Sequence, residues 1–283
     1  MIVAGLPFRR RLLRFAGHRL AVLAYLAFAL LPLYWLVKIA VTPDRLLYTE
    51  GIALWPSRMS LDAFAAVLGK TAFPTYFRNS IVVSLGTAAA VTLVAAGAGY
   101  AFSRFRFRGR YPLMFVLLLT QMFPLVMLIA PIYRLMAPLG LTDSLAGLVV
   151  VYTAFNTPFA TFLMQSFFDG IPKDLEEAAL IDGCSRLSAV RRVVLPLTLP
   201  GLGATLGFVF TAAWSELLFA LMLINSDSQK TFAVGLLTFV SKFSVDWGQM
   251  MAAAVLALIP AVLFFVFIQR YLVQGLTAGS VKG

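Results

Sequence analysis

The stretch FDGIPKDLEEAALIDGCSRLSAVRRVVLPLTLP (residues 168–200) is polar in its first half and lies between two apolar windows, residues 144–168 and 193–215. Pro172 and Asp174 are residues that favour the start of a helix. Glutamates in the first turn of such a helix suit its positive N-terminal end. The stretch therefore predicts a short helix outside the apolar windows.

Glycine, serine, arginine and proline then predict how this segment continues. Gly183 can end the short helix because glycine accepts a positive φ. Ser185 can cap a second helix, whose C-terminal end suits basic side chains. We expect the second helix to end near Arg191 and Arg192. We expect the pair Leu195-Pro196 to turn the chain into the next apolar window. The prediction is a helix, a turn and a second helix.

The same segment resembles the EAA loop of permease subunits in binding-protein-dependent ABC importers. That loop reads EAA, three residues, Gly, nine residues, Ile or a similar residue, one residue, and Leu-Pro. Every spacing is met here, with valine in place of isoleucine (Glu177, Ala178, Ala179, Gly183, Val193, Leu195, Pro196). A bare EAA triplet would be a weak signal, and the alternative is a plain amphipathic interfacial helix.

The resemblance extends over most of the chain and narrows the substrate class. Further matching positions are Asn79-Ser80, residues 98–105, Gly109, residues 122–124, Pro131 and the tail at residues 269–283. The tail is similar to that of carbohydrate-class permeases of the MalG type. The resemblance implies a sugar importer, for a disaccharide or oligosaccharide such as a maltose- or trehalose-type glycoside. The same architecture for a polyol, a glycerol phosphodiester or a peptide stays an alternative.

The composition indicates a chain whose main solvent is lipid. Of its 283 residues 61% are hydrophobic and 12% are charged, whereas a soluble domain carries about 25% charged residues. We therefore expect an all-α polytopic membrane protein, since backbone groups in lipid need internal hydrogen bonds and barrel alternation is absent. Six apolar windows are long enough to span a bilayer: residues 20–37, 79–103, 111–133, 144–168, 193–215 (extended to 224) and 247–269.

Basic residues predict the orientation of these spans. Most of the 23 lysines and arginines fall in the N-terminal arm, the loops after the second and fourth spans, and the C-terminal tail. The positive-inside rule then makes both termini cytoplasmic. The net charge of +11 is explained without nucleic acid. We expect a basic arm (residues 1–19), a first span with an external loop (20–78), a permease core (79–270) that contains the coupling loop (169–198), and a tail (271–283).

The chain lacks a nucleotide site of its own. Gly69-Lys70-Thr71 resembles the end of a phosphate-binding loop, but Phe64 stands where that loop needs its first glycine. The resemblance implies two cytoplasmic ATPase subunits that hold ATP and Mg²⁺, and into which the EAA helix docks. It also implies a second, homologous permease subunit and an external solute-binding protein that contacts residues 225–246. The expected location is a bacterial or archaeal inner membrane.

Polar or aromatic residues within the apolar runs are candidates for the solute path. Hydrogen-bonding groups and aromatic faces bind sugars, and an ionisable residue within a span is by default a functional hypothesis. The candidates lie in the fourth and fifth spans (Asn156, Thr157, Trp214, Ser215, Glu216). Packing between helices is the competing interpretation for Asn156, and interface solvation or pairing for Glu216.

Two other classes of protein fit the sequence less well. A secondary transporter or channel would need ionisable residues at mid-membrane, and spans one to four and six have none within their windows. An intramembrane enzyme would need a nucleophile with a base, or metal ligands. The chain has one cysteine and one histidine, Cys184 and His18, and both lie outside the windows.

Overall fold

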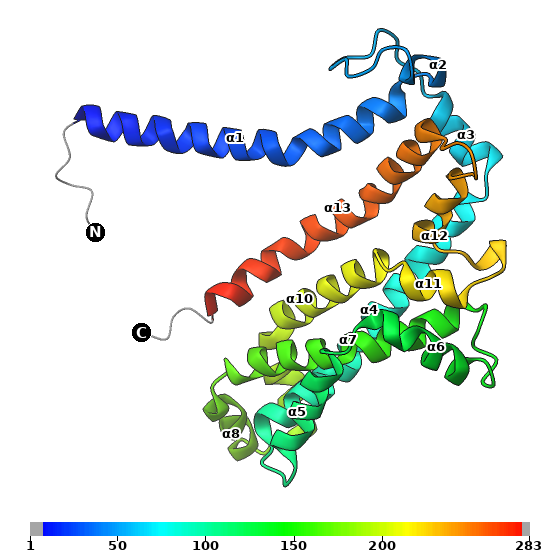
Figure 1. Ribbon diagram of the computed structural model, residues 1–283. Helices are drawn as coiled ribbons and strands as arrows, with labels where there is room; N and C mark the ends of the chain where they lie inside the picture. Colours follow the sequence, from blue (N-terminus) through cyan, green and yellow to red (C-terminus); the bar gives the residue numbers. More distant parts are fainter. Residues whose placement is uncertain (1–7, 279–283) are drawn as a thin grey trace. The chain divides into compact units, whose positions relative to one another are not determined.

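The structure is a computed structural model that describes the backbone of residues 8–278 and the side chains of residues 17–269 (Figure 1). Within that part every regular element is a helix, and one isolated bridge pairs Val240 with Val245. The all-α prediction is confirmed. The helices are α1 (Phe8–Val41), α2 (Asp44–Leu47), α3 (Asp62–Lys70), α4 (Phe73–Arg104), α5 (Arg110–Thr120), α6 (Leu125–Met136), α7 (Leu145–Asp169), α8 (Lys173–Ile181), α9 (Arg186–Ala189), η1 (Val190–Val194), α10 (Leu195–Trp214), α11 (Leu218–Leu223), η2 (Asp227–Gln229), α12 (Phe232–Leu236), η3 (Leu237–Phe239) and α13 (Trp247–Ala278).

Four of the predicted spans correspond to single long helices, α1, α4, α7 and α13. With the helix over Arg186–Trp214, five described helices are long and apolar enough to cross a membrane. A sixth is added when the bent pair α5–α6 counts as one span. The multi-pass membrane architecture is thereby confirmed.

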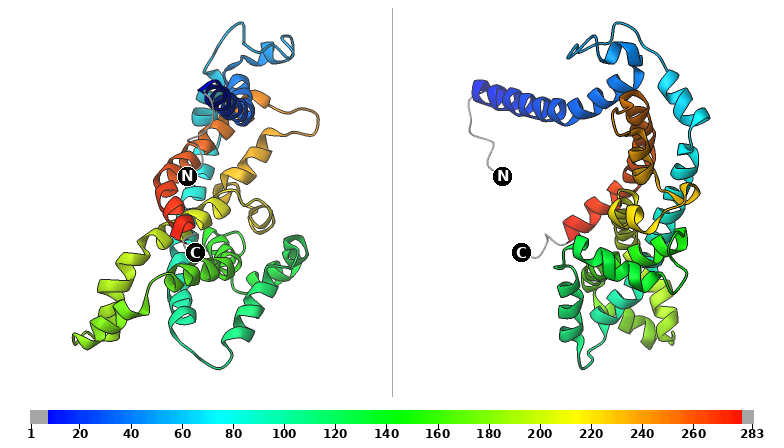
Figure 2. Two further views of the ribbon diagram at one scale, coloured as in Figure 1. Left: turned by 90° about the vertical axis from the view of Figure 1, so that its left-hand side faces the viewer. Right: turned by 45° about the vertical axis from the view of Figure 1, so that its right-hand side comes forward.

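The third span is not the single helix predicted over residues 111–133. It consists of α5 and α6, which meet at 102° across a four-residue break (Figures 1 and 2). Pro124 at the break lacks an N–H and disfavours helical φ/ψ at Phe123. The side-chain amide of Gln121 donates to the carbonyl of Phe155 in α7 at 3.2 Å, which fixes the bend to a neighbouring helix.

The fifth span does not continue to residue 224 as predicted. Helix α10 ends at Trp214, and a separate short helix, α11, begins at Leu218. The carboxylate of Glu216 accepts the backbone N–H groups of Phe219 (2.9 Å) and Ala220 (3.2 Å). A side chain that satisfies the first free N–H groups starts a new helix, so Glu216 marks a break in the span.

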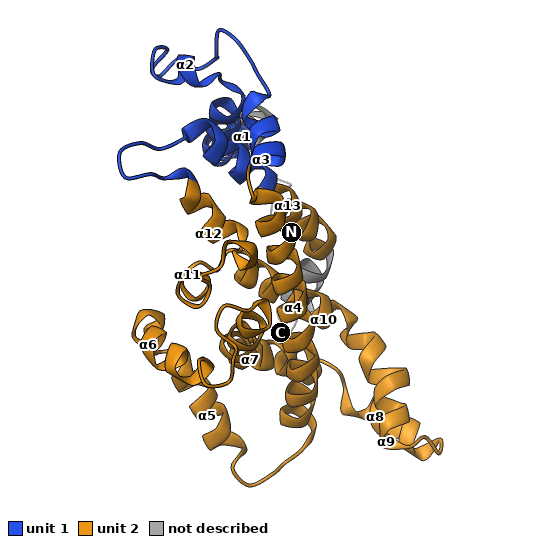
Figure 3. Cartoon of the chain, turned by 90° about the vertical axis from the view of Figure 1, so that its right-hand side faces the viewer, with its two compact units in different colours: residues 1–70, 239–256 blue, residues 71–238, 257–283 orange. Residues whose placement is uncertain are grey.

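The chain divides into two compact units (Figure 3). Unit 1 contains residues 1–70 and 239–256, and unit 2 contains residues 71–238 and 257–283. Residues 1–7 of the predicted arm and residues 279–283 of the predicted tail lie outside the described part. In unit 1 a Cβ added on Gly248 would clash with Oδ1 of Asp44, so α2 approaches the start of α13 closely. Partial burial raises the pKa of Asp44, and repulsion from Asp246 and Asp62 raises it further.

Unit 2 is centred on the crossing of α4 and α7. Ala88, Val91 and Ala95 recur at helical spacing on α4 and are almost fully buried. At Gly99 an added Cβ would come within 2.8 Å of both the backbone nitrogen of Gln165 and the Cβ of Met164. Because one of these atoms is backbone, it cannot move aside, and the helices can approach so closely only with glycine here.

We predict that Gly99→Ala lowers the thermal stability of the detergent-purified protein by about 1–3 kcal/mol, the usual cost of overpacking. Gly97→Ala is the matched control in the same helix, since nothing lies within 4 Å of a Cβ there. The control should melt at the wild-type temperature or slightly above it, because alanine favours helix over glycine. Equal melting temperatures for the two variants would contradict the close approach.

Candidate functional site

Helix α8 is the predicted short helix outside the spans. It follows Pro172, whose φ is −54°, and has Asp174 and Glu176 in its first turn. At its end the N–H of Gly183 donates to the carbonyl of Leu180 at 3.1 Å, and the N–H of Cys184 donates to that of Ala179 at 3.0 Å. With Gly183 at φ +85° these two bonds form a Schellman motif, so the prediction that this glycine ends the helix is confirmed.

The second predicted helix begins at the predicted cap. The hydroxyl of Ser185 accepts the N–H of Ser188 at 3.3 Å, and α9 starts at Arg186. The predicted turn at Leu195-Pro196 is wrong, because α9, η1 and α10 form one continuous helix over Arg186–Trp214. Segment η1 is a π-helical turn. In it the N–H of Leu195 donates to the carbonyl of Val190, five residues back. This widening gives the ring of Pro196 room that a regular α-helix would deny it.

A buried ion pair joins α8 to the end of α4. The Nε atom of Arg104 lies 3.2 Å from Oε2 of Glu176, and the two side chains are 5% and 7% exposed. The same carboxylate accepts the hydroxyl of Tyr100, and Nη2 of Arg104 donates to the carbonyl of Ile171 at 3.0 Å. A buried charge pair needs such additional hydrogen bonds to offset the loss of hydration. The segment 171–176 is therefore fastened to α4.

Further contacts extend this junction to α7. The hydroxyl of Ser103 donates to Asp169 at 2.6 Å and accepts Nη1 of Arg104 at 3.3 Å. The ring of Phe105 packs edge-on against Tyr100 and lies 5.1 Å from the guanidinium of Arg186. The ends of α4 and α7 and the starts of α8 and α9 thus form one connected junction.

The predicted coupling residues divide between the outer face of this loop and its base. Glu177, Ala178 and Gly183 are exposed, Ala179 is half-buried, and Pro196 is exposed as the second residue of α10. Apolar side chains stand out beside them, with Ile181 86% exposed and Leu187 78% exposed. Leu195 is half-buried at the π-helical turn. The outer face of α8 is exposed in the part of the chain that the structure describes, whereas its inner face is bonded through Glu176.

The candidate path residues lie on α7 and at or just beyond the end of α10. Asn156 and Thr157 are half-buried on α7 and bond the carbonyls one turn back, Tyr152 at 2.8 Å and Thr153 at 2.6 Å. Trp214 is 5% exposed and packs among Phe77, Phe210 and Phe232.

The other two path candidates lie just beyond Trp214. Ser215 is exposed and donates to Thr211 at 3.0 Å. Glu216 accepts the hydroxyl of Tyr152 at 2.5 Å besides capping α11. Trp214 is thus buried among aromatic rings, and Glu216 has hydrogen-bond partners within this chain.

At the opposite end of α4 and α7, the segment that follows α11 is fixed by carboxylates. Asp143 accepts the backbone N–H groups of Asn225 (2.9 Å) and Ser226 (2.8 Å) and also the hydroxyl of Ser226. The hydroxyl bond, followed by the two backbone bonds, holds the pKa of Asp143 below its usual value. The pKa of Asp227 is likewise lowered, by Lys230 and by the hydroxyl of Tyr76. The stability that each ionised carboxylate contributes is therefore fully present above the pKa of an unfolded carboxyl group. It is lost as the pH falls through the lowered pKa of the folded protein.

Several apolar helices long enough to span a membrane, with a helical loop fastened to one end of them, form the architecture of a multi-pass membrane protein. Residues 92–278 match the family model for the binding-protein-dependent transport system inner membrane component. The chain belongs to this family.

Relatives cover nearly the whole chain. It is 34% identical to the diacetylchitobiose uptake system permease protein DasC of Streptomyces coelicolor, over 89% of this chain and 91% of that protein. It is 33% identical to the trehalose/maltose transport system permease protein MalG of Thermococcus litoralis, over 90% of this chain and 92% of that protein. A crystal structure of a bacterial ABC transporter involved in alginate import has the same fold, with a TM-score of 0.79 at 23% identity over 95% of this chain and 99% of that chain.

We predict that Arg104→Met and Glu176→Met each lower the free energy of unfolding by about 3–5 kcal/mol, because either change leaves a buried charge unpaired. The double variant should lose less than the sum of the two, with a coupling energy of about 1–3 kcal/mol. Unfolding of the purified protein by heat or denaturant measures the cycle. Arg106→Met and Glu177→Met, at exposed neighbouring positions, form the control cycle and should be additive. Additive losses at Arg104 and Glu176 would refute the buried pair.

Proposed function

We propose that the chain is the permease subunit of an ATP-driven importer and forms half of the translocation path for a disaccharide or oligosaccharide. The observation that carries the substrate class is the match over nearly the full length to relatives named for diacetylchitobiose and for trehalose/maltose. The MalG-type tail supports the same class. In this proposal the other half of the path comes from a second, homologous permease chain.

The outer face of α8 is the proposed docking surface for a separate ATPase. Glu177, Ala178 and Ala179 supply a charged group beside small side chains, which permit close approach of another protein surface. Two ATPase subunits would carry ATP and Mg²⁺ and stand on the cytoplasmic side, the side that the basic loops favour for both termini. Gly183 keeps the helix short, and Leu195 and Pro196 mark where the loop rejoins the span. A solute-binding protein would deliver sugar on the opposite side of an inner membrane.

Coupling follows from the way in which α8 is attached. ATP must favour one state of the transporter over the other, and it can act only through contacts that differ between the states. A displacement of α8 by the ATPases would pull on α4 through Arg104 and on α7 through the short segment that contains Ile171. The two helices that form the centre of unit 2 would then move with the docked helix.

The proposed solute contacts within this chain are Asn156 and Thr157. They lie on neighbouring positions of α7, and each keeps free hydrogen-bonding capacity beside its bond to the backbone. Ser215 at the end of α10 is a weaker candidate of the same kind. Trp214 and Glu216 support the ends of the spans in this proposal, and their effect on solute would be indirect.

Glu177→Lys should abolish solute uptake by proteoliposomes containing the full complex, because it reverses a charge at the proposed docking surface. The amount of inserted protein and its melting temperature should stay at wild-type values, since the side chain is exposed. Asp62→Lys, an exposed acid in α3, is the matched control and should transport normally. Wild-type uptake by Glu177→Lys would remove α8 from the coupling mechanism.

The substrate class is tested on the importer's own solute-binding protein. We expect its thermal unfolding temperature to rise with disaccharides or oligosaccharides, and uptake by the reconstituted complex to follow the same sugar. Polyols, glycerol phosphodiesters and peptides form the comparison panel. A response to one of these classes, with none to sugars, would overturn the substrate assignment and leave the importer architecture standing.

A further inference from the structure

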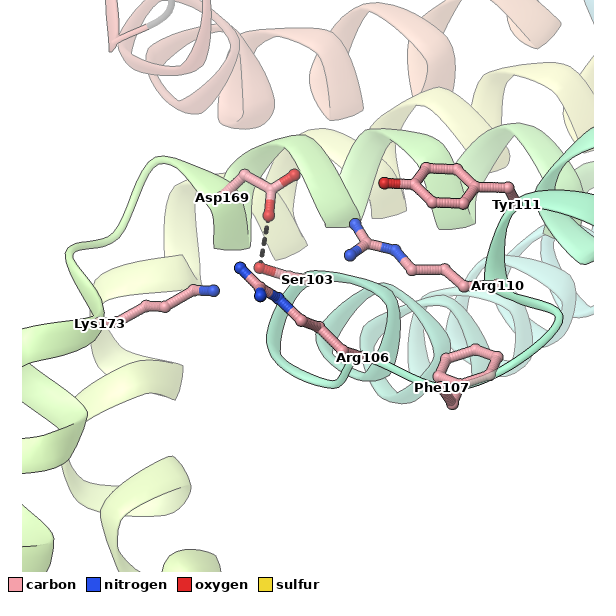
Figure 4. A pocket seen from close by; sticks show the side chains of 7 residues that line it. All are labelled: Ser103, Arg106, Phe107, Arg110, Tyr111, Asp169 and Lys173. Atoms are coloured by element: carbon pink, nitrogen blue, oxygen red, sulfur yellow. Dashed lines mark hydrogen bonds between the residues drawn. The ribbon is translucent and has the colours of Figure 1, made fainter.

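A polar cavity of about 470 Å³ lies beside the junction of α4, α7 and α8, at the point where α5 begins (Figure 4). Three basic side chains line it, Arg106, Arg110 and Lys173, and they come from three different segments. Figure 4 shows them pointing into one space in front of Ser103 and Asp169. The volume lies within the range of about 300–1,000 Å³ that small-ligand sites occupy.

The cations of this cavity are not neutralised within the part of the chain that the structure describes. The ion pairs found there are Arg104–Glu176 and Lys230–Asp227, and neither involves a cavity cation. One carboxylate, Asp169, faces the three cations and is already bonded to the hydroxyl of Ser103 and, at 3.4 Å, to the amide of Gln165. The cavity therefore has an excess of positive charge.

Arg110 gives a second, independent sign that a ligand belongs here. Its Nε atom is buried and has no hydrogen-bond partner among the described residues, although buried N–H groups are almost always bonded. Its guanidinium lies 5.7 Å from the ring of Tyr111, which holds it at the mouth of the cavity. An arginine fork matches the oxygens of a phosphate, and lysine adds a compact second charge.

We propose that this cavity binds the phosphate of an anionic phospholipid headgroup such as phosphatidylglycerol. The cavity lies where the spanning helix α4 ends and the bent span α5–α6 begins. The ends of membrane spans meet the headgroup region, so we place the cavity at that depth. Beside it α5 exposes a continuous apolar surface along which acyl chains can lie, with Leu113 48%, Phe115 60% and Val116 52% exposed. Tyr111, 77% exposed, has the amphipathic character of aromatic residues at membrane interfaces. A soluble phosphate ester would use the same cations and would need no apolar surface.

The test is native mass spectrometry of the detergent-purified complex after addition of phosphatidylglycerol or phosphatidylcholine. The wild-type protein should retain phosphatidylglycerol preferentially. Arg106→Gln/Lys173→Gln removes two exposed cations and should weaken retention about 25-fold, about fivefold for each cation. Arg110→Gln should weaken it by about fivefold or more. The control Arg108→Gln/Arg134→Gln removes the same charge from exposed positions outside the cavity and should retain the lipid.

A second arm separates lipid from soluble phosphate. Millimolar inorganic phosphate and glucose 6-phosphate are added to the lipid-loaded complex, and neither should displace phosphatidylglycerol. Displacement by either compound, or equal retention of the two lipids by the wild type, would overturn the lipid assignment. An equal loss in the control double variant would show attraction by overall charge, and that result would also overturn it.

Discussion

The buried ion pair between Arg104 and Glu176 is the constraint on which the rest of unit 2 depends. Both side chains have lost nearly all contact with solvent, so neither charge can be left alone without a large cost in stability. The pair is complete only when α8 lies against the end of α4, and the carbonyl of Ile171 keeps the connecting segment there as well. Helix α8 is thus bonded to α4 on one face and exposed on the other among the described residues. A partner that held the exposed face would act directly on α4 and α7.

The sequence predicted those features of this junction that local chemistry decides. Proline before a helix, glycine at its end and serine as a cap act within a few residues, so α8, Gly183 and Ser185 could be read from the chain. The pairing of Arg104 with Glu176 joins segments far apart in sequence. In the sequence Arg104 is one of several basic residues that predict orientation and belongs to the matching stretch 98–105, and Glu176 is a favourable charge at a helix start. Residue type carried no information about their contact.

Two prolines illustrate the same limit within single elements. Pro196 was expected to turn the chain, and instead a π-helical turn absorbs its ring and the helix continues. Pro124 lies in an apolar window that predicted one helix, and there the chain bends by 102°. Near Pro124 the hydrogen bonds run three residues back, as at the end of a helix, and the bend is fixed by a bond from Gln121 to α7. What surrounds a proline in space, rather than its place in the sequence, decides between these outcomes.

Glu216, one of the path candidates, makes contacts that the sequence alone could not show. A carboxylate within an apolar run has to satisfy its oxygens, and Glu216 does so by starting α11 and by accepting the hydroxyl of Tyr152. At the other end of the bundle the balance is reversed, since Arg106, Arg110 and Lys173 exceed the single carboxylate that faces them. Ser103 belongs to both the cavity and the junction, because its hydroxyl bonds Asp169 and Arg104. A phosphate that neutralised the cavity would therefore also stabilise the attachment of the docking helix, whose first residue, Lys173, it would touch.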